Sequence, residues 1–335
     1  MTAAGTAVPL VQRVYRLLCD QQFHSGTKLA ADCDVSRSAI WKAIAALREL
    51  GVTVHAVAHR GYRLPRASVP LDARRIRAAL PAAVAARLRR GVTVWSTGST
   101  NADLLVQSDL PPGRFDFLAA EYQSAGRGRR TRSWFAPPGG SICLSIGWSF
   151  QSLPASIGAL SLAAGVCVLR ALKRSGVPGV ELKWPNDLVA GDAKLAGVLA
   201  ELRAEAAGPA FVVIGIGLNV ALGASVLERV KASGTLATDL ATLSPAPPDR
   251  DAITAALLAE TIAGLQQFER QGFSAFAAEW HAADALAGKA VQVKLDAGSI
   301  RGHARGIDAE GALCVQTRDG LQRFMTGDVS VRAVA

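Results

Sequence analysis

Apolar residues recur at helical spacing over the first fifty positions of the chain. The pattern predicts helices over residues 8–21, 27–33 and 36–50, with Ser36 as the N-cap of the third helix and Gly51 just past its end. One face of that helix carries the apolar stripe Ile40, Ile44 and Leu47. The opposite face is polar and basic and is formed by Arg37, Ser38, Trp41, Lys42 and Arg48. Short helices followed by one with a basic face are typical of a helix-turn-helix.

A short alternating pattern follows the third predicted helix. Residues 52–57 alternate as a strand does, His59-Arg60-Gly61 predicts a turn, and residues 62–64 return as a second strand. Such a hairpin would form the wing of a winged helix. Residues 1–70 carry nine Lys or Arg and four Asp or Glu, a net charge of +5, which favours binding to duplex DNA. The alternative is that the winged helix binds another protein rather than DNA.

The periodicity changes to a mixed α/β pattern after residue 91. Residues 65–70 resemble a linker, and residues 71–90 predict a basic helical stretch with a solvated face. The predicted strands are 92–95, 117–122, 141–150 and 211–219, the predicted helices are 155–175 and 251–285, and 221–250 is predicted to be irregular. From Gly288, alternating apolar residues and spaced glycines predict a small β-barrel or sandwich. We therefore expect three domains, over residues 1–66, 67–285 and 286–335.

Composition limits the environment and the partners of the chain. A formal charge of +10 favours polyanionic partners. Five scattered cysteines without a Cys-x-x-Cys pair suit a reducing cytoplasm, and the histidines have no metal-ligand spacing. The first residues lack the pattern of a secretory signal, and the most apolar run, residues 155–172, contains Arg170 and predicts a buried helix. We expect a cytoplasmic protein that does not span a membrane.

A run of alternating glycines and arginines, residues 126–134, is the most distinctive stretch of the sequence. Glycine allows backbone N–H groups to converge on one point, arginine offers cationic forks, and Trp134 offers a face on which a flat ring could stack. The run predicts a loop that closes over an anion bearing a ring, such as a nucleotide. It lacks the ending of a Walker A loop. A basic surface loop or a nucleic-acid patch is the alternative.

Two further groups of polar residues are candidates for chemistry. Lys183, Asp187 and Lys194 are close in sequence, and two ammonium groups with a carboxylate suit nucleotidyl transfer, since they neutralise phosphate and can hold Mg²⁺. An ordinary surface ion pair is the alternative. Residues 96–101 are small and polar, and they either cap the next helix or bond a polar ligand. No Ser/His/Asp or Cys/His arrangement stands out, which argues against a covalent hydrolase.

The ordered motifs resemble the family of bifunctional biotin–protein ligases and biotin operon repressors. The matching pieces are Ser99-Thr100-Asn101, Glu121-Tyr122-Gln123, Gly126-Arg127-Gly128-Arg129-Arg130 with Trp134, Lys183-Trp184-Pro185-Asn186-Asp187, Lys194-Leu195-Ala196-Gly197 and Gly215-Ile216-Gly217-Leu218-Asn219. The resemblance implies a multidomain α+β protein with a winged helix-turn-helix, a class II synthetase-like ligase domain and a small SH3-like β-barrel. It also implies ATP and biotin as substrates and Mg²⁺ as cofactor.

The resemblance also implies a role for individual residues. Ser99, Thr100 and Gln123 would hold the ureido ring, the 127–129 loop would fold over biotin and phosphate, and Lys194 would sit on the biotin carboxylate and α-phosphate. The implied biotin-binding set is Ser99, Thr100, Asn101, Gln123, Arg127, Gly128, Arg129 and Lys194. The implied set for ATP and adenylate is Arg129, Arg132, Trp134, Lys183, Asn186, Asp187 and Asn219. Catalysis would fall to Arg129, Lys194, Lys183 and Asp187, with Asp187 as Mg²⁺ ligand and as a candidate proton acceptor in the transfer step.

The family's partners are a biotin carboxyl carrier protein of acetyl-CoA carboxylase and, for a homodimer loaded with biotinyl-adenylate, operator DNA. The residues expected to contact DNA are Ser36, Arg37, Ser38, Trp41, Lys42 and Arg60. Trp41 is bulky for a groove-facing position, and His59-Arg60-Gly61 enlarges the wing tip, so either could change the operator sequence. The alternatives are a lipoate–protein ligase, a transcription factor that only senses a small effector, and a ligase whose winged helix no longer binds DNA.

Overall fold

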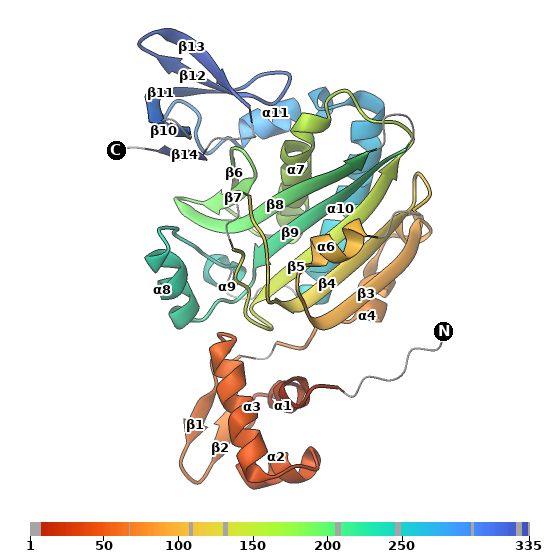
Figure 1. Cartoon of the computed structure of the whole chain (residues 1–335), viewed down its shortest axis with the longest axis vertical. Helices are drawn as coiled ribbons and strands as arrows, with labels where there is room; N and C mark the ends of the chain where they lie inside the picture. The colour runs from red at the N-terminus through yellow and green to blue at the C-terminus, as the bar shows by residue number, and fades with distance from the viewer. Residues whose placement is uncertain are drawn as a thin grey trace.

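A computed structural model describes residues 8–66, 68–106, 110–129, 133–204, 209–244, 249–295, 298–325 and 330–333. Figure 1 shows three parts along the longest axis of the molecule: a small helical domain with a two-stranded hairpin, a large sheet with helices, and a small sheet at the far end. This arrangement confirms the fold predicted from the sequence.

The first part is a winged helix. Its elements are α1 (Leu10–Leu18), α2 (Gly26–Asp32), α3 (Arg37–Glu49), β1 (His55–Val57) and β2 (Gly61–Arg63). The Ser36 hydroxyl accepts a hydrogen bond from the Ala39 N–H at 3.2 Å, so Ser36 caps α3 as predicted. Ile40, Ile44 and Leu47 are buried in a core that also contains residues of α1 and α2. The helical stripe therefore packs inward and leaves the basic face of α3 in solvent.

The central part is built on a seven-stranded sheet with the strand order β3-β4-β5-β9-β8-β7-β6. Its strands are β3 (Leu88–Thr97), β4 (Phe115–Gln123), β5 (Ser141–Phe150), β6 (Glu181–Lys183), β7 (Asp187–Ala190), β8 (Ala193–Ala204) and β9 (Ala210–Asn219). Only the β3–β4 pair is parallel within these strands. The helices of this part are α4 (Ala73–Ala79), α5 (Ala82–Ala85), α6 (Thr100–Leu105), α7 (Leu160–Arg174), α8 (Ala224–Ala232), α9 (Leu240–Leu243), α10 (Arg250–Gln271) and α11 (Ser274–Ala282).

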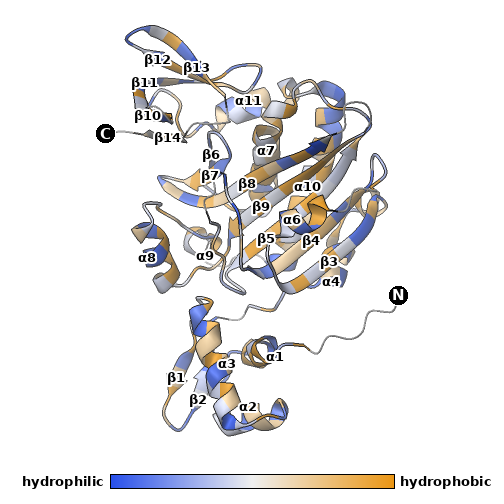
Figure 2. Cartoon of the chain, viewed as in Figure 1, coloured by the Kyte–Doolittle hydropathy of each residue, from blue (hydrophilic) through white to orange (hydrophobic). Residues whose placement is uncertain are grey.

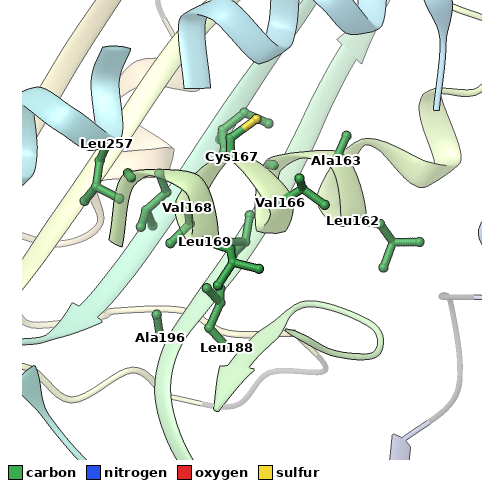
Figure 3. Close-up of a cluster of buried hydrophobic side chains, with 14 of the residues drawn as sticks. Leu162, Ala163, Val166, Cys167, Val168, Leu169, Leu188, Ala196 and Leu257 are labelled. Atoms are coloured by element: carbon green, nitrogen blue, oxygen red, sulfur yellow. The ribbon is translucent and has the colours of Figure 1, made fainter. Parts of the chain in front are cut away.

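Helices cover both faces of the central strands. In Figure 1, α7 and α10 lie behind the sheet and α6 lies in front of it. Every residue of β5 is buried, which explains why both faces of this strand carry apolar residues. Figure 2 shows many apolar residues along the strands, and Figure 3 shows Leu188, Ala196 and Leu257 packed around α7. Among the described residues, no helix is long and apolar enough to cross a membrane. The apolar run that was predicted to be a buried helix forms η1 (Ile157–Ala159) followed by α7.

The last part is a five-stranded antiparallel sheet, as the alternating pattern predicted. Its strands are β10 (Ala290–Leu295), β11 (Gly298–Ile307), β12 (Leu313–Thr317), β13 (Gly320–Phe324) and β14 (Ser330–Ala333), in the order β13-β12-β11-β10-β14. The indole N–H of buried Trp184 donates to the Gly311 carbonyl at 3.1 Å. This bond joins the small sheet to the β6–β7 hairpin of the central part.

Two sequence predictions about local structure were wrong. Residues 88–90 belong to β3 rather than to a basic helix, because β3 pairs with β4 and brings Arg89 against the buried carboxylate of Asp116, with Nε 3.0 Å from Oδ1. Residues 221–250 were predicted to be irregular but contain α8 and α9. α8 buries only Val226, so its sequence has little apolar periodicity from which to predict a helix.

Candidate active site

Residues 126–134, which we call the Gly/Arg loop, lie between β4 and β5 in the chain. The two ends of this loop are bonded to each other. The Trp134 N–H donates to the Gly126 carbonyl at 2.9 Å, and Arg127 pairs with Ser133 as an isolated antiparallel bridge. Gly128 and Arg129 continue the loop and are partly buried. Arg132, which was predicted to contact adenylate, lies outside the described residues. These contacts tie the two arms of the loop to each other at its base.

The Trp134 side chain lies on two glycines of the neighbouring strands. A Cβ atom on Gly217 would come within 2.4 Å of Trp134 Cε2, and one on Gly197 would lie 3.5 Å from Trp134 Cζ3. Trp134 therefore rests on bare backbone of β8 and β9, which explains the need for glycine at position 217. The Lys194 Nζ atom lies 5.5 Å from the centre of its ring. Trp134 was predicted to lie near adenine; here it forms part of the floor of the site.

Lys183, Asp187 and Lys194 lie on three consecutive strands. Lys183 and Asp187 are directly opposite each other in the β6–β7 hairpin, and the Lys194 Nζ atom is 2.5 Å from Asp187 Oδ1. The side chains of Asp187 and Lys194 are about one-quarter exposed. The site thus holds a partly solvated ion pair next to Trp134, at the position where an anionic ligand would exchange one partner of the pair.

The two asparagines of the site, Asn186 and Asn219, donate hydrogen bonds from their side-chain amides to backbone carbonyls. The Asn186 amide donates to the Val198 carbonyl at 2.7 Å and thereby ties the β6–β7 turn to β8. The Asn219 amide donates to the carbonyls of Thr238 at 3.0 Å and Lys194 at 3.3 Å. Both side-chain amides therefore bond to β8, the strand that carries Lys194, and hold that strand in place within the site.

A chain of polar side chains lies under the start of α6. The Thr100 N–H and hydroxyl lie 2.8 and 3.0 Å from Gln123 Oε1, and the Ser99 hydroxyl caps α6. Asn101 Nδ2 donates to Glu201 Oε2 at 2.6 Å. The Ser145 hydroxyl lies 2.7 Å from Thr100 Oγ1 and 2.5 Å from Asn101 Oδ1.

Sequence reasoning missed Ser145 and Glu201. The available signal was a fully buried serine in the middle of the apolar strand β5, since a buried hydroxyl needs partners. The structure brings Ser99, Thr100, Asn101 and Gln123 together, and their role in binding biotin stays a prediction. Their elements are α6 and the end of β4.

A polar cluster joins β4 and the segment before β5 to the winged helix, and we call it the linker cluster: Tyr15, Ser68, Glu121, Gly139 and Arg250. Glu121 Oε2 accepts from Arg250 Nη2 and from the Gly139 N–H, each at 2.9 Å. The Tyr15 hydroxyl donates to the Ser68 carbonyl at 2.8 Å, and the Ser68 hydroxyl donates to the Gly139 carbonyl at 2.6 Å. Burial raises the pKa of Tyr15, so its hydroxyl stays neutral and donates. A cavity of about 470 Å³ opens beside the cluster, between the two domains.

The winged helix exposes basic residues both on α3 and on the wing. Arg37, Ser38, Trp41 and Lys42 are exposed, and Trp41 retains 63% of its accessible surface. The Ser36 hydroxyl is engaged as a cap and with the Ser38 hydroxyl at 2.8 Å. On the wing, the guanidinium groups of Arg60 and Arg63 lie 4.1 and 4.7 Å from the centre of the Phe23 ring.

These features define a class of protein: a winged helix joined to an α/β domain whose sheet carries a Gly/Arg loop, a lysine–aspartate pair and a small β-domain beyond them. Three family models match the same three parts. The HTH domain matches residues 11–63, the Biotin/lipoate A/B protein ligase family matches 92–219, and the Biotin protein ligase C terminal domain matches 287–332.

Individual relatives match nearly the whole chain. The bifunctional ligase/repressor BirA of Salmonella typhimurium is 37% identical, covering 98% of this chain and 98% of its own length. The biotin–[acetyl-CoA-carboxylase] ligase of Mycobacterium tuberculosis is 40% identical over 78% of this chain and 95% of its own. The structure of biotin protein ligase from Aquifex aeolicus in complex with biotin and ATP has a TM-score of 0.61 and 25% identity, covering 73% of this chain and all of that one. The chain belongs to the biotin/lipoate A/B protein ligase family.

Proposed function

We propose that the protein is an ATP-dependent biotin–protein ligase, which forms biotinyl-5′-AMP and transfers biotin to a lysine of the carboxyl carrier protein of acetyl-CoA carboxylase. The observation that carries this proposal is the Lys194–Asp187 pair beside Trp134, under the closed base of the Gly/Arg loop. The relatives named above support biotin rather than lipoate as the substrate, since one is named a bifunctional ligase/repressor BirA and the other a biotin–[acetyl-CoA-carboxylase] ligase.

In the first step, the biotin carboxylate attacks the α-phosphorus of ATP and pyrophosphate leaves. The carboxylate is already ionised, so the protein needs to supply orientation and positive charge rather than a general base. Lys194 would leave Asp187 for the reacting carboxylate and phosphate, and Lys183 would neutralise the leaving pyrophosphate. Arg127 and Arg129 would close over the product and keep water from the mixed anhydride.

Mg²⁺ would enter with the phosphates of ATP. Among the described residues, no group of three His, Cys, Asp or Glu side chains could enclose a metal ion. Mg²⁺ in nucleotide sites usually takes one or two carboxylates plus substrate phosphates and water, and Asp187 suits that arrangement. When bound, Mg²⁺ supplies charge neutralisation at the phosphates.

In the second step, a lysine amine of the carrier attacks the acyl carbon of the adenylate, and AMP leaves. The amine must first lose a proton. Once Lys194 has turned to the phosphate, the Asp187 carboxylate is the nearest candidate to accept it. The side-chain amides of Asn186 and Asn219 would hold β8 in place during this exchange of partners.

We also propose that the winged helix binds operator DNA as a homodimer when the adenylate is bound. The basic α3 surface and Arg60 on the wing support DNA binding. Adenylate would order the Gly/Arg loop, and the linker cluster offers a bonded route from Glu121 and Gly139, which lie on either side of that loop in the sequence, to Tyr15 of α1. Sedimentation velocity with and without biotinyl-AMP tests the dimer, and retention of a monomer in both would reject it.

Biotin-dependent ATP–pyrophosphate exchange tests the ligase proposal. We expect exchange with biotin and little with lipoate, and we expect Lys194→Ala to abolish it. Lys289→Ala, which removes an exposed lysine outside the site, is the matched control and should keep wild-type exchange. If folded wild-type protein exchanges with neither acid, the ligase proposal is wrong and an effector-sensing regulator becomes the better account.

A further inference from the structure

We propose that Glu201 is a positioning residue that sets the direction of the hydrogen bonds around Thr100, and that it thereby favours a ligand ring that carries N–H groups, such as a cyclic urea. The inference rests on the proposed function, because it concerns the same site. Glu201 itself lies on β8, three hydrogen bonds away from Thr100. Its influence would pass through Asn101 and Ser145.

The carboxylate end of the chain fixes the orientation of an amide. An ionised carboxylate only accepts hydrogen bonds, so the group facing Glu201 Oε2 at 2.6 Å is the NH₂ of Asn101. That orientation turns Asn101 Oδ1 toward the Ser145 hydroxyl, 2.5 Å away. Asn101 has no freedom to move aside, because its side chain lies on Gly215, where a Cβ atom would come within 2.4 Å of Oδ1.

The orientation of Asn101 then determines that of Ser145. A carbonyl oxygen cannot donate, so Ser145 gives its single proton to Asn101 Oδ1. Ser145 is fully buried, and its other contact is Thr100 Oγ1 at 2.7 Å. This contact is a hydrogen bond only if Thr100 donates to Ser145, since Ser145 has no second proton.

These hydrogen-bond directions leave the side-chain oxygen of Thr100, Oγ1, able to accept a further hydrogen bond. Gln123 Oε1 already accepts from the Thr100 N–H at 2.8 Å, so it does not depend on the hydroxyl. Whether the Thr100 proton points to Ser145 or to Gln123, no hydroxyl donates to Thr100 Oγ1, and its lone pairs stay available. An N–H of a cyclic urea can donate to that oxygen, whereas the dithiolane ring of lipoate has no N–H group.

A change of Glu201 to glutamine removes the constraint on the orientation of Asn101 without changing the shape of the side chain. In Glu201→Gln, the new amide can donate, so Asn101 can turn its oxygen toward position 201 and its NH₂ toward Ser145. Ser145 then gives its proton to Thr100, and Thr100 Oγ1 receives a protein donor in place of the ligand. One ordinary hydrogen bond corresponds to a roughly three- to tenfold change in affinity.

The test measures biotin-dependent pyrophosphate exchange for wild type, Glu201→Gln and the double variant Glu201→Gln/Asn101→Asp. We expect Glu201→Gln to raise KM for biotin roughly three- to tenfold, to leave kcat nearly unchanged, and to narrow the preference for biotin over lipoate. In the double variant, a carboxylate at position 101 again accepts from Ser145, so KM should return to within about twofold of wild type. Thermal unfolding of each protein checks that it is folded.

The outcomes separate this inference from the proposed function. Absence of exchange in the wild type would reject the ligase proposal. Normal wild-type exchange with an unchanged KM in Glu201→Gln would overturn the role of Glu201. A folded double variant with a KM as high as the single variant would also overturn it, because a merely structural contact would not be restored by moving the charge from position 201 to position 101.

Discussion

The buried ion pair between Glu121 and Arg250 gives the most demanding prediction about stability. The two side chains are 3% and 7% exposed and come from β4 and α10, 129 residues apart. Glu121 Oε1 also accepts from the Leu71 N–H at 2.7 Å, and Oε2 from the Gly139 N–H. Burial opposes the charge of Arg250, but Glu121 and the other groups around it together outweigh burial and raise the pKa of Arg250. A guanidinium group is not deprotonated in proteins, so Arg250 stays charged when its partner is removed.

Glu121→Gln would leave that charge buried without compensation. Breaking a buried pair in this way costs about 3–5 kcal/mol in free energy of unfolding. For a domain of this size, each kcal/mol corresponds to roughly 2–4 °C, so we expect Tm to fall by roughly 6–20 °C. The matched control is Glu310→Gln, whose pair with Arg323 is more than half exposed, so the Tm of this variant should stay close to that of the wild type.

Differential scanning calorimetry of both variants is the assay. Adding Arg250→Met to Glu121→Gln should recover part of the loss, because the uncompensated charge is then gone. A loss below about 1 kcal/mol in Glu121→Gln would contradict the reasoning, since the pair would then behave as an exposed one.

Three further predictions follow from individual contacts. Asp72→Ala should cost about 1 kcal/mol at pH 7, because hydrogen bonds from the backbone of Arg74 and Arg75 lower the pKa of the Asp72 cap. That stability is present above the pKa of Asp72 in the unfolded chain and is lost as pH falls through its pKa in the folded protein. Urea unfolding should therefore show that the difference in free energy of unfolding between wild type and Asp72→Ala shrinks toward pH 2. A difference that stays constant with pH would be inconsistent with this reasoning. Gly217→Ala should displace Trp134 and reduce the rate of pyrophosphate exchange at least tenfold. In Gly197→Ala the new methyl group meets only the flexible end of Lys194 at 3.1 Å, so the rate of exchange should fall less. Equal effects of the two variants would argue against the packing of Trp134 on Gly217. Burial raises the pKa of Cys143 to about 12, so iodoacetamide at pH 8 should leave Cys143 unlabelled in native protein and label it in urea, as read by mass spectrometry; rapid native labelling would refute this.

The parts of the fold that depend on local pattern were predictable from the sequence. The stripe of α3 and its Ser36 cap follow from helical spacing, and the buried run of β5 follows from strand length and apolar content. The proximity of Lys183, Asp187 and Lys194 was also predictable, because a short hairpin keeps neighbouring residues together.

The contacts that sequence reasoning missed depend on distant segments. Ser145 and Glu201 meet α6 from different strands, and Arg250 reaches Glu121 across the domain. Each of these residues satisfies a partner that only the folded sheet supplies, so no local period marks it. Asn219 shows the same effect, since its amide bonds to backbone of Lys194 and Thr238 become evident only in three dimensions.

Intact-mass spectrometry of a carboxyl carrier domain incubated with the protein, ATP and biotin tests the proposed ligase activity most directly. The account predicts one biotin added per carrier, no addition when the acceptor lysine is replaced by arginine, and no addition with Lys194→Ala. Wild-type protein that binds biotin and ATP but leaves the carrier unmodified would contradict it.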